Sequence, residues 1–208
     1  MTTLDAALLD VRKAYRLLAD YQQRLFELMG LIRERLGASD YYHNYAQSLP
    51  QALAGMDKRD KSGLRFLPLF DATFIWLKHQ GQSEPWAKPL PGDVMFGAWV
   101  RSDTGFDKHT TSFDDLPAEE TRSEVVLSAV VCRNAPAGKF NWYDHAWCGI
   151  DYPEDGHVND TDLPGFACYS KAIPLAAFAD AVSIEHALGA WCAEAGAKLG
   201  IPLALATR

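Results

Sequence analysis

An apolar repeat at the start of the chain constrains the fold more than any other feature. Its ten positions are spaced alternately four and three residues apart, and nine of them are apolar. Together they form the seam: Leu4, Leu8, Val11, Tyr15, Leu18, Gln22, Leu25, Met29, Ile32 and Leu36. Because an α-helix turns once every 3.6 residues, this spacing lines the side chains along one helix face for more than four heptads.

Signals at both ends bound this helix. Thr3 is a suitable N-cap, and Asp5 suits the positive end of the helix dipole. Gly37 stands where a left-handed residue commonly ends a helix. The sequence therefore predicts one amphipathic helix within residues 1–37, about 33 residues and roughly 50 Å long.

The width of the seam leaves two arrangements open. Tyr21, Phe26 and Leu28 flank it, and so wide a stripe suits packing onto a sheet or into a bundle. Gln22, polar within the seam, is the kind of residue that fixes register in oligomers. The helix therefore either lies across its own sheet or joins copies of the chain, and we expect a homo-oligomer.

Residues 38–65 are predicted to form a connector, in which Ser48 begins one short helix. After the connector, the pattern changes from helical periodicity to strand-like runs. Short runs rich in aromatic and branched residues predict strands at 70–77, 94–100, 125–132 and 166–173, with a weaker candidate at 142–150. No long helix separates these runs, which favours antiparallel pairing over parallel βαβ units.

A second helix closes the chain, with Ser183 as its expected cap and Gly200 at its end. The predicted fold class is thus α+β: an antiparallel sheet of about four or five strands, packed on one face by the long N-terminal helix and the C-terminal helix. Residues 38–208 form the α+β domain, which we expect to be one structural unit with the helix.

Charge is distributed unevenly along the chain. The net charge is −7, yet residues 1–65 hold ten Lys and Arg against eight Asp and Glu. Residues 103–162 hold thirteen acids against four bases. Such a surface repels nucleic acid and attracts basic proteins or cations, so we expect a basic protein partner and no nucleic acid.

Cysteine usage and hydropathy bear on location. Cys132, Cys148, Cys168 and Cys192 are widely spaced and form no C-x-x-C pair, which indicates reduced thiols. The chain shows neither a signal-peptide pattern nor an apolar stretch of about 18 residues. We therefore expect a cytoplasmic protein that does not contact a membrane.

The sequence lacks the common motifs of nucleotide-binding loops and catalytic sites. It contains no G-x-G-x-x-G, no G-x-x-x-x-G-K-[ST], no G-x-S-x-G and no H-E-x-x-H. No residue is therefore assigned a catalytic role. The missing motifs favour a non-enzyme but leave open an enzyme that works without them.

The loop at 144–162 is the richest in chemistry-bearing side chains. His145, Cys148, Asp151 and His157 are of the types that bind zinc, although zinc sites usually show two close ligand pairs. Trp147 lies beside them in sequence.

A calcium loop fits the same segment in part. With Asp151 as the first position, Asp155 is fifth, Gly156 sixth and Asp162 twelfth. Pro153 stands where an oxygen ligand belongs, which counts against calcium. A polar surface loop whose Pro and Gly set turns explains the pattern equally simply.

The same region predicts a partner-binding surface. Trp142 and Trp147 lie close in sequence to Asp151, Glu154 and Asp155. Aromatic side chains anchor many protein interfaces, and the acids would face the basic partner.

These observations predict a non-enzymatic interaction or adaptor protein. It self-associates through its N-terminal helix and presents the acidic 103–162 face to a basic partner. The alternative is a small metal-dependent hydrolase centred on the 144–162 loop, with zinc or calcium as its ion. A third possibility is an aromatic-lined small-molecule pocket between the sheet and the helices.

Overall fold

The computed structural model describes residues 3–45, 71–105 and 117–207. Its helices are α1 (Thr3–Leu36) and α2 (Ala181–Leu199), with short turns η3 (Ala118–Glu120), η4 (Trp142–Trp147) and η5 (Leu175–Phe178). Its strands are β1 (Ser39–Tyr45), β2 (Asp71–Lys78), β3 (Val94–Arg101), β4 (Glu124–Cys132), β5 (Val158–Asn159) and β6 (Phe166–Pro174).

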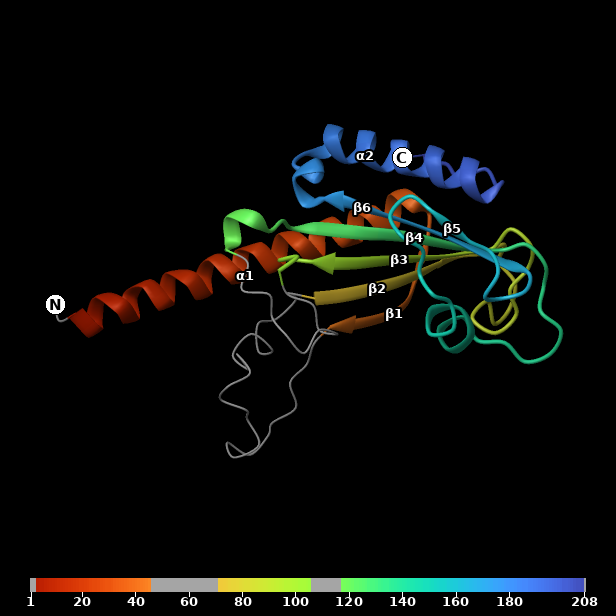
Figure 1. Cartoon of the computed structure of the whole chain (residues 1–208), viewed down its shortest axis with the longest axis horizontal. Helices are drawn as coiled ribbons and strands as arrows, with labels where there is room; N and C mark the ends of the chain where they lie inside the picture. The colour runs from red at the N-terminus through yellow and green to blue at the C-terminus, as the bar shows by residue number, and fades with distance from the viewer. Residues whose placement is uncertain (1–2, 46–70, 106–116, 208) are drawn as a thin grey trace, which may run out of the picture.

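The strands form one antiparallel sheet in the order β1-β2-β3-β4-β6-β5 (Figure 1). The α+β class and the antiparallel pairing are confirmed, although the sheet has six strands where four or five were expected. The first additional strand, β1, falls inside the predicted connector, and the second, β5, is only two residues long.

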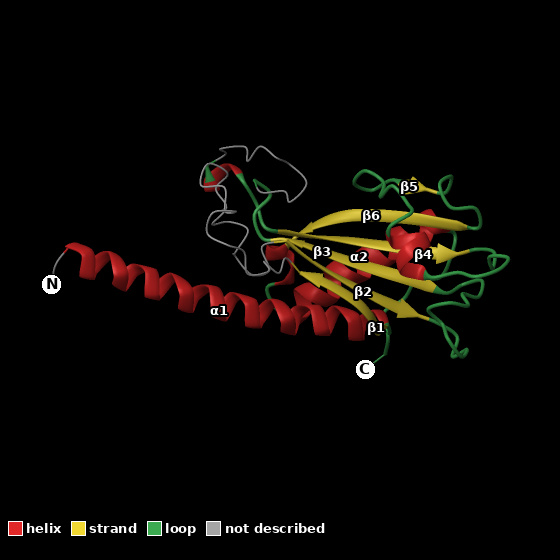
Figure 2. Ribbon diagram, turned by 90° about the horizontal axis from the view of Figure 1, so that it is seen from below, coloured by secondary structure: helices red, strands yellow, loops and turns green. Residues whose placement is uncertain are grey.

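Both long helices cover the same face of the sheet, as predicted (Figures 1 and 2). The core beneath them takes Leu25 and Ile32 from α1, Leu188 and Trp191 from α2, and Phe96 from the sheet. An ion pair between Arg35 Nε and Glu185 Oε1, at 2.6 Å, joins the end of α1 to α2. Gly37 ends α1 in the left-handed region, at φ +65°, as the sequence indicated.

A separate segment, residues 140–163, covers part of the opposite face. The core under it includes Met95, Val130 and Cys168 from the sheet, with Phe140 and Trp142 above them. The sheet is therefore covered on two sides, by helices on one and by this covering segment on the other.

Two local predictions differ from the structure, and a third falls outside the described residues. The weak strand at 142–150 is wrong, because the Asn141 side chain accepts hydrogen bonds from the Tyr143 and Asp144 backbone N–H groups and starts the π-helical turn η4. The cap of α2 is Asp180, which accepts a hydrogen bond from Ser183 N, and not Ser183 itself. The short helix at Ser48 lies outside the described residues.

The part of the chain that the structure describes contains no helix with both the length and the apolar composition of a membrane span.

Candidate functional sites

The seam divides into two halves with different environments. From Leu25 onward its residues are buried, and Ile32 is completely inaccessible. Toward the N-terminus, Leu8 is 46% exposed and Tyr15 is 69% exposed. Residues 4–18, here the free half of α1, extend beyond the sheet (Figures 1 and 2). One continuous apolar pattern thus packs against the chain's own sheet and then continues into solvent.

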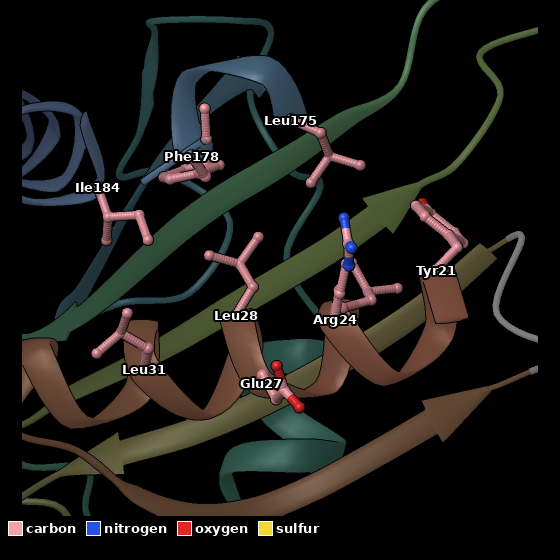
Figure 3. Close-up of a pocket in the computed structure, with 10 residues that line it drawn as sticks. Tyr21, Arg24, Glu27, Leu28, Leu31, Leu175, Phe178 and Ile184 are labelled. Atoms are coloured by element: carbon pink, nitrogen blue, oxygen red, sulfur yellow. The ribbon is translucent and has the colours of Figure 1, made fainter. Parts of the chain in front are cut away.

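An open groove begins where the free half ends (Figure 3). It has a volume of about 540 Å³ and lies between α1 and the η5–α2 connection. Leu28 and Leu31 face Phe178 and Ile184 across it. The full lining is Tyr21, Arg24, Leu25, Glu27, Leu28, Leu31, Leu175, Phe178, Ala179 and Ile184. The groove is apolar with one charge of each sign.

A second hollow, here the sheet-face cavity, lies on the opposite face of the sheet. Its volume is about 260 Å³. The sheet contributes Thr73, Trp99, Val126, Ser128 and Ser170, and the covering segment contributes Trp147, Tyr152 and Pro153. It therefore does not lie between the sheet and the helices, where the sequence placed the alternative pocket.

Strand register places two of the cavity hydroxyl groups side by side and the third one row away. Ser128 lies between Gly97 and Ser170 in adjacent strands, and Thr73 pairs with Trp99, two residues beyond Gly97. Thr73, Ser128 and Ser170 are at most 5% exposed. Ser128 Oγ lies 3.5 Å from Gly97 O, the outer limit of a hydrogen bond, so this hydroxyl is only weakly engaged.

The wall formed by Trp147 depends on a glycine. A Cβ placed on Gly97 would lie 2.8 Å from the Trp147 ring and 2.5 Å from Ser128 Oγ. The Trp147 ring in turn packs against Tyr152, with centroids 4.9 Å apart. Gly97 thus lets the indole lie directly on the sheet backbone and shape the cavity.

Tyr152 carries an unsatisfied polar atom. Among the described residues its buried hydroxyl has no hydrogen-bond partner. Burial raises the Tyr152 pKa, so the phenol stays neutral at physiological pH. A buried, unsatisfied hydroxyl costs about 1–3 kcal/mol of stability.

Two arginines next to the cavity pair with one buried carboxylate. Glu124 is 2% exposed and pairs with Arg101 at 2.8 Å and Arg122 at 2.7 Å. The Arg101 guanidinium also lies over the Trp99 ring, 5.0 Å from its centroid. A buried carboxylate requires such pairing, so these two cations are committed to Glu124.

The predicted binding residues are divided between core and surface. Trp142 is 1% exposed, and its indole N–H donates to Pro85 O at 3.0 Å, so its ring belongs to the core. Trp147 is half-buried at the cavity. Asp151, Glu154 and Asp155 are exposed, and Asp155 Oδ1 accepts a hydrogen bond from Ala172 N at 2.7 Å.

The four candidate zinc ligands are not gathered into a site. No group of three or more His, Cys, Asp or Glu among the described residues is arranged to hold a metal ion, and His145, Cys148, Asp151 and His157 are all described. His145 instead stacks on Phe140 at 5.1 Å.

The candidate calcium loop is organised by its own hydrogen bonds. Asp162 accepts from Asp151 N at 2.9 Å and from the Asn159 amide at 2.7 Å. The backbone and side-chain donors lower the Asp162 pKa. Two of the proposed ligands, Asp155 and Asp162, thus hold the loop in shape.

The thiols differ in accessibility. Cys132, Cys168 and Cys192 are buried, whereas Cys148 is exposed. Burial raises the pKa of Cys168 to about 12 and that of Cys192 to about 11. Thiols with such pKa values are poor nucleophiles at neutral pH.

Sequence reasoning missed the cavity residues Thr73, Gly97 and Ser128. The available signal was weak: a hydroxyl or glycine replaces an apolar side chain at one point in each of three strands. Only the register shows that Gly97 lies beside Ser128 and that Thr73 lies in the neighbouring row of the same sheet.

The described residues thus define a class: an α+β protein with a two-sided antiparallel sheet, a projecting apolar helix half and a hydroxyl-lined cavity. By sequence, the chain belongs to the PM0109 family, whose model matches residues 1–200. A relative from Pasteurella multocida (strain Pm70), described as "Uncharacterized protein PM0109", is 34% identical over 191 residues, covering 89% of this chain and 90% of the relative. No solved structure matches the chain.

Proposed function

We propose that this protein is an interaction protein that self-associates through α1. The observation that carries the proposal is the exposure of Leu4, Leu8, Val11 and Tyr15, between 46% and 69%, on the same seam that is buried further along the helix. Fully burying such a side chain stabilises a protein by about 1.5–3 kcal/mol. A stretch of α1 that met only water would gain nothing from keeping the apolar heptad pattern.

The occupant that fits this surface is a second copy of the chain. Residues 3–36 contain five acids and six bases, so two copies of α1 approach without strong net repulsion. The groove beside residues 21–31 continues directly from the free half and is apolar. A pair of copies therefore offers each free half a complementary apolar surface.

An antiparallel pair uses both surfaces. If two α1 helices cross at Leu18, Leu8 lies opposite Leu28 and Tyr15 lies opposite Tyr21. Each free half then lies along the groove of the other copy, in a closed twofold interface. A parallel pair would join the free halves over only about two heptads and would leave both grooves empty.

The mass of the protein in solution tests self-association. Light scattering and native mass spectrometry of the full chain should give a dimer, and Leu8→Glu/Val11→Glu should give a monomer with an unchanged circular dichroism spectrum. Val182→Glu is the matched control, because Val182 is 79% exposed but lies on α2. A monomeric wild type at 100 µM, or a double variant that remains dimeric, would contradict the proposal.

Cysteine crosslinking tests the orientation. In a Cys148→Ser background, which removes the exposed thiol, Leu8→Cys with Leu28→Cys should form a disulfide-linked dimer. Leu8→Cys alone should not do so. Crosslinking of the single variant would indicate a parallel pair instead.

The acidic 103–162 region extends the proposal to a basic protein partner. Some of its acids serve the fold, as Glu124 and Asp162 show, but Asp144, Asp151 and Glu154 are exposed. A polylysine peptide should bind the wild type and lose affinity steeply with salt. Asp151→Lys/Glu154→Lys should weaken this binding, and equal affinity for both proteins would remove the basic partner from the proposal.

A further inference from the structure

We propose that the sheet-face cavity binds a small, neutral, heteroaromatic molecule of about nucleobase size. The site is separate from α1 and the groove, so this inference is independent of self-association. It lies among residues of β2, β3, β4, β6 and the covering segment.

The volume of the cavity limits the size of its ligand. The cavity has a volume of about 260 Å³. An engineered apolar cavity of about 150 Å³ holds benzene, so this one has room for one or two rings. It is smaller than the roughly 300–1,000 Å³ of sites for drug-sized molecules.

The walls favour a flat, aromatic ligand. Trp99 and Trp147 present indole rings, and Val126 and Pro153 add apolar surface. Trp147 is held against the sheet because Gly97 has no side chain to displace it. Aromatic rings stack favourably on such surfaces, with centroids about 4.5–7 Å apart.

Polar groups around the cavity favour a heterocycle over a hydrocarbon. Thr73, Ser128 and Ser170 bring hydroxyl groups to a sheet face that is apolar one row further along, at Met95 and Val130. A hydroxyl both donates and accepts, so it serves ring nitrogens and carbonyl oxygens equally. Tyr152 adds a buried hydroxyl that has no hydrogen-bond partner among the described residues, and a ligand that hydrogen-bonds to it recovers the cost of burying it.

Charge and composition disfavour two other ligand classes. An anion would find no charged side chain among the described residues that line the cavity, and the nearby Arg101 and Arg122 pair with Glu124. A sugar can stack its C–H face on an indole, but it needs partners for several hydroxyl groups at once, and the walls formed by Val126 and Pro153 offer none.

Calorimetry and thermal unfolding of the full chain test the site, with adenine, cytosine and uracil as heteroaromatic probes and toluene as the apolar probe. At least one base should bind at one per chain and raise the melting temperature. Thr73→Val keeps the side-chain shape and removes the hydroxyl, and should weaken binding about three- to tenfold. Ser170→Leu, which fills the cavity, should abolish it.

The matched control is Ser83→Val, since Ser83 is exposed and outside the cavity. It should bind the probes as the wild type does. Failure of all three bases to bind would overturn the proposal and leave a water-filled cavity. Toluene binding as tightly as the bases, with no effect of Thr73→Val, would overturn its heteroaromatic part.

Discussion

The hydroxyl oxygens of Tyr21 and Ser102 lie 2.9 Å apart, at the point where α1 leaves the sheet. Burial raises the Tyr21 pKa, so the phenol remains a neutral hydrogen-bonding group. Beyond this contact the helix is stabilised locally, for example by the Lys13–Asp10 ion pair at 3.0 Å. Surface pairs of this kind contribute little, so the free half depends on an anchored helix or on a partner.

Removing the hydrogen bond between Tyr21 and Ser102 should destabilise the packing of α1 on the sheet. Tyr21→Phe deletes the hydroxyl and should lower the free energy of unfolding by about 0.5–1.5 kcal/mol, measured by urea denaturation. Tyr15→Phe is the matched control when both substitutions are made in the monomeric Leu8→Glu/Val11→Glu background, because Tyr15 is 69% exposed in the single chain. It should change the free energy by less than about 0.5 kcal/mol. Equal effects of the two substitutions would mean that the Tyr21–Ser102 contact does not stabilise the protein.

The two halves of the seam should respond differently to truncation. Ile32 is 0% exposed, so Ile32→Ala should cost about 2–5 kcal/mol at any protein concentration. Leu8→Ala should instead weaken self-association, so that its effect on urea denaturation grows with protein concentration. If Leu8→Ala lowered the free energy of unfolding as much as Ile32→Ala does, and equally at every protein concentration, the seam would not be divided into a buried half and a free half.

Local signals explain which parts of the fold the sequence predicted. The end of α1 was predictable because Gly37 is a local backbone signal and the seam is a repeated one. β2, β3, β4 and β6 were predicted to within about two residues because each is a run of branched and aromatic side chains. Such features depend on neighbours in the sequence and need no knowledge of the remainder of the chain.

The features that the sequence did not predict depend on residues far apart in the chain. Strand β1 is polar in part, with Asp40 and Asn44. It is a strand because it pairs with β2, from Tyr45 with Ala72 to Ser39 with Leu77, across a long intervening segment. The η4 turn is fixed by Asn141, to which the Tyr41 hydroxyl also donates at 3.0 Å. The sheet-face cavity likewise forms where residues of four strands lie side by side. The pattern of one strand does not show which residues of the other strands lie next to it.

Two glycines give opposite predictions for the same substitution. Gly97→Ala should cost roughly 1–3 kcal/mol, because its Cβ would lie 2.5 Å from Ser128 Oγ and 2.8 Å from the Trp147 ring. Gly30→Ala, inside α1 with nothing within 4 Å of its Cβ, should stabilise the protein by up to about 1 kcal/mol. Chemical denaturation of both variants checks the pair, and a harmless Gly97→Ala would show that Trp147 moves freely.

The cap of α2 should give the protein a measurable dependence on acid. Asp180 accepts a hydrogen bond from Ser183 N at 2.8 Å, and this contact lowers the Asp180 pKa in the folded state. A lowered folded-state pKa means that the charged cap stabilises the fold above the unfolded pKa of about 3.9. This stabilisation is lost as the pH falls through the folded-state value.

Asp180→Ser isolates that effect, because serine is also a good N-cap but does not titrate. The melting temperature of the wild type should therefore fall more steeply than that of Asp180→Ser between about pH 5 and pH 2. Other carboxylates titrate equally in both proteins, so only the difference between the two curves counts. Parallel curves would show that the charge of Asp180 contributes nothing to α2, and that the hydrogen bond to Ser183 alone caps the helix.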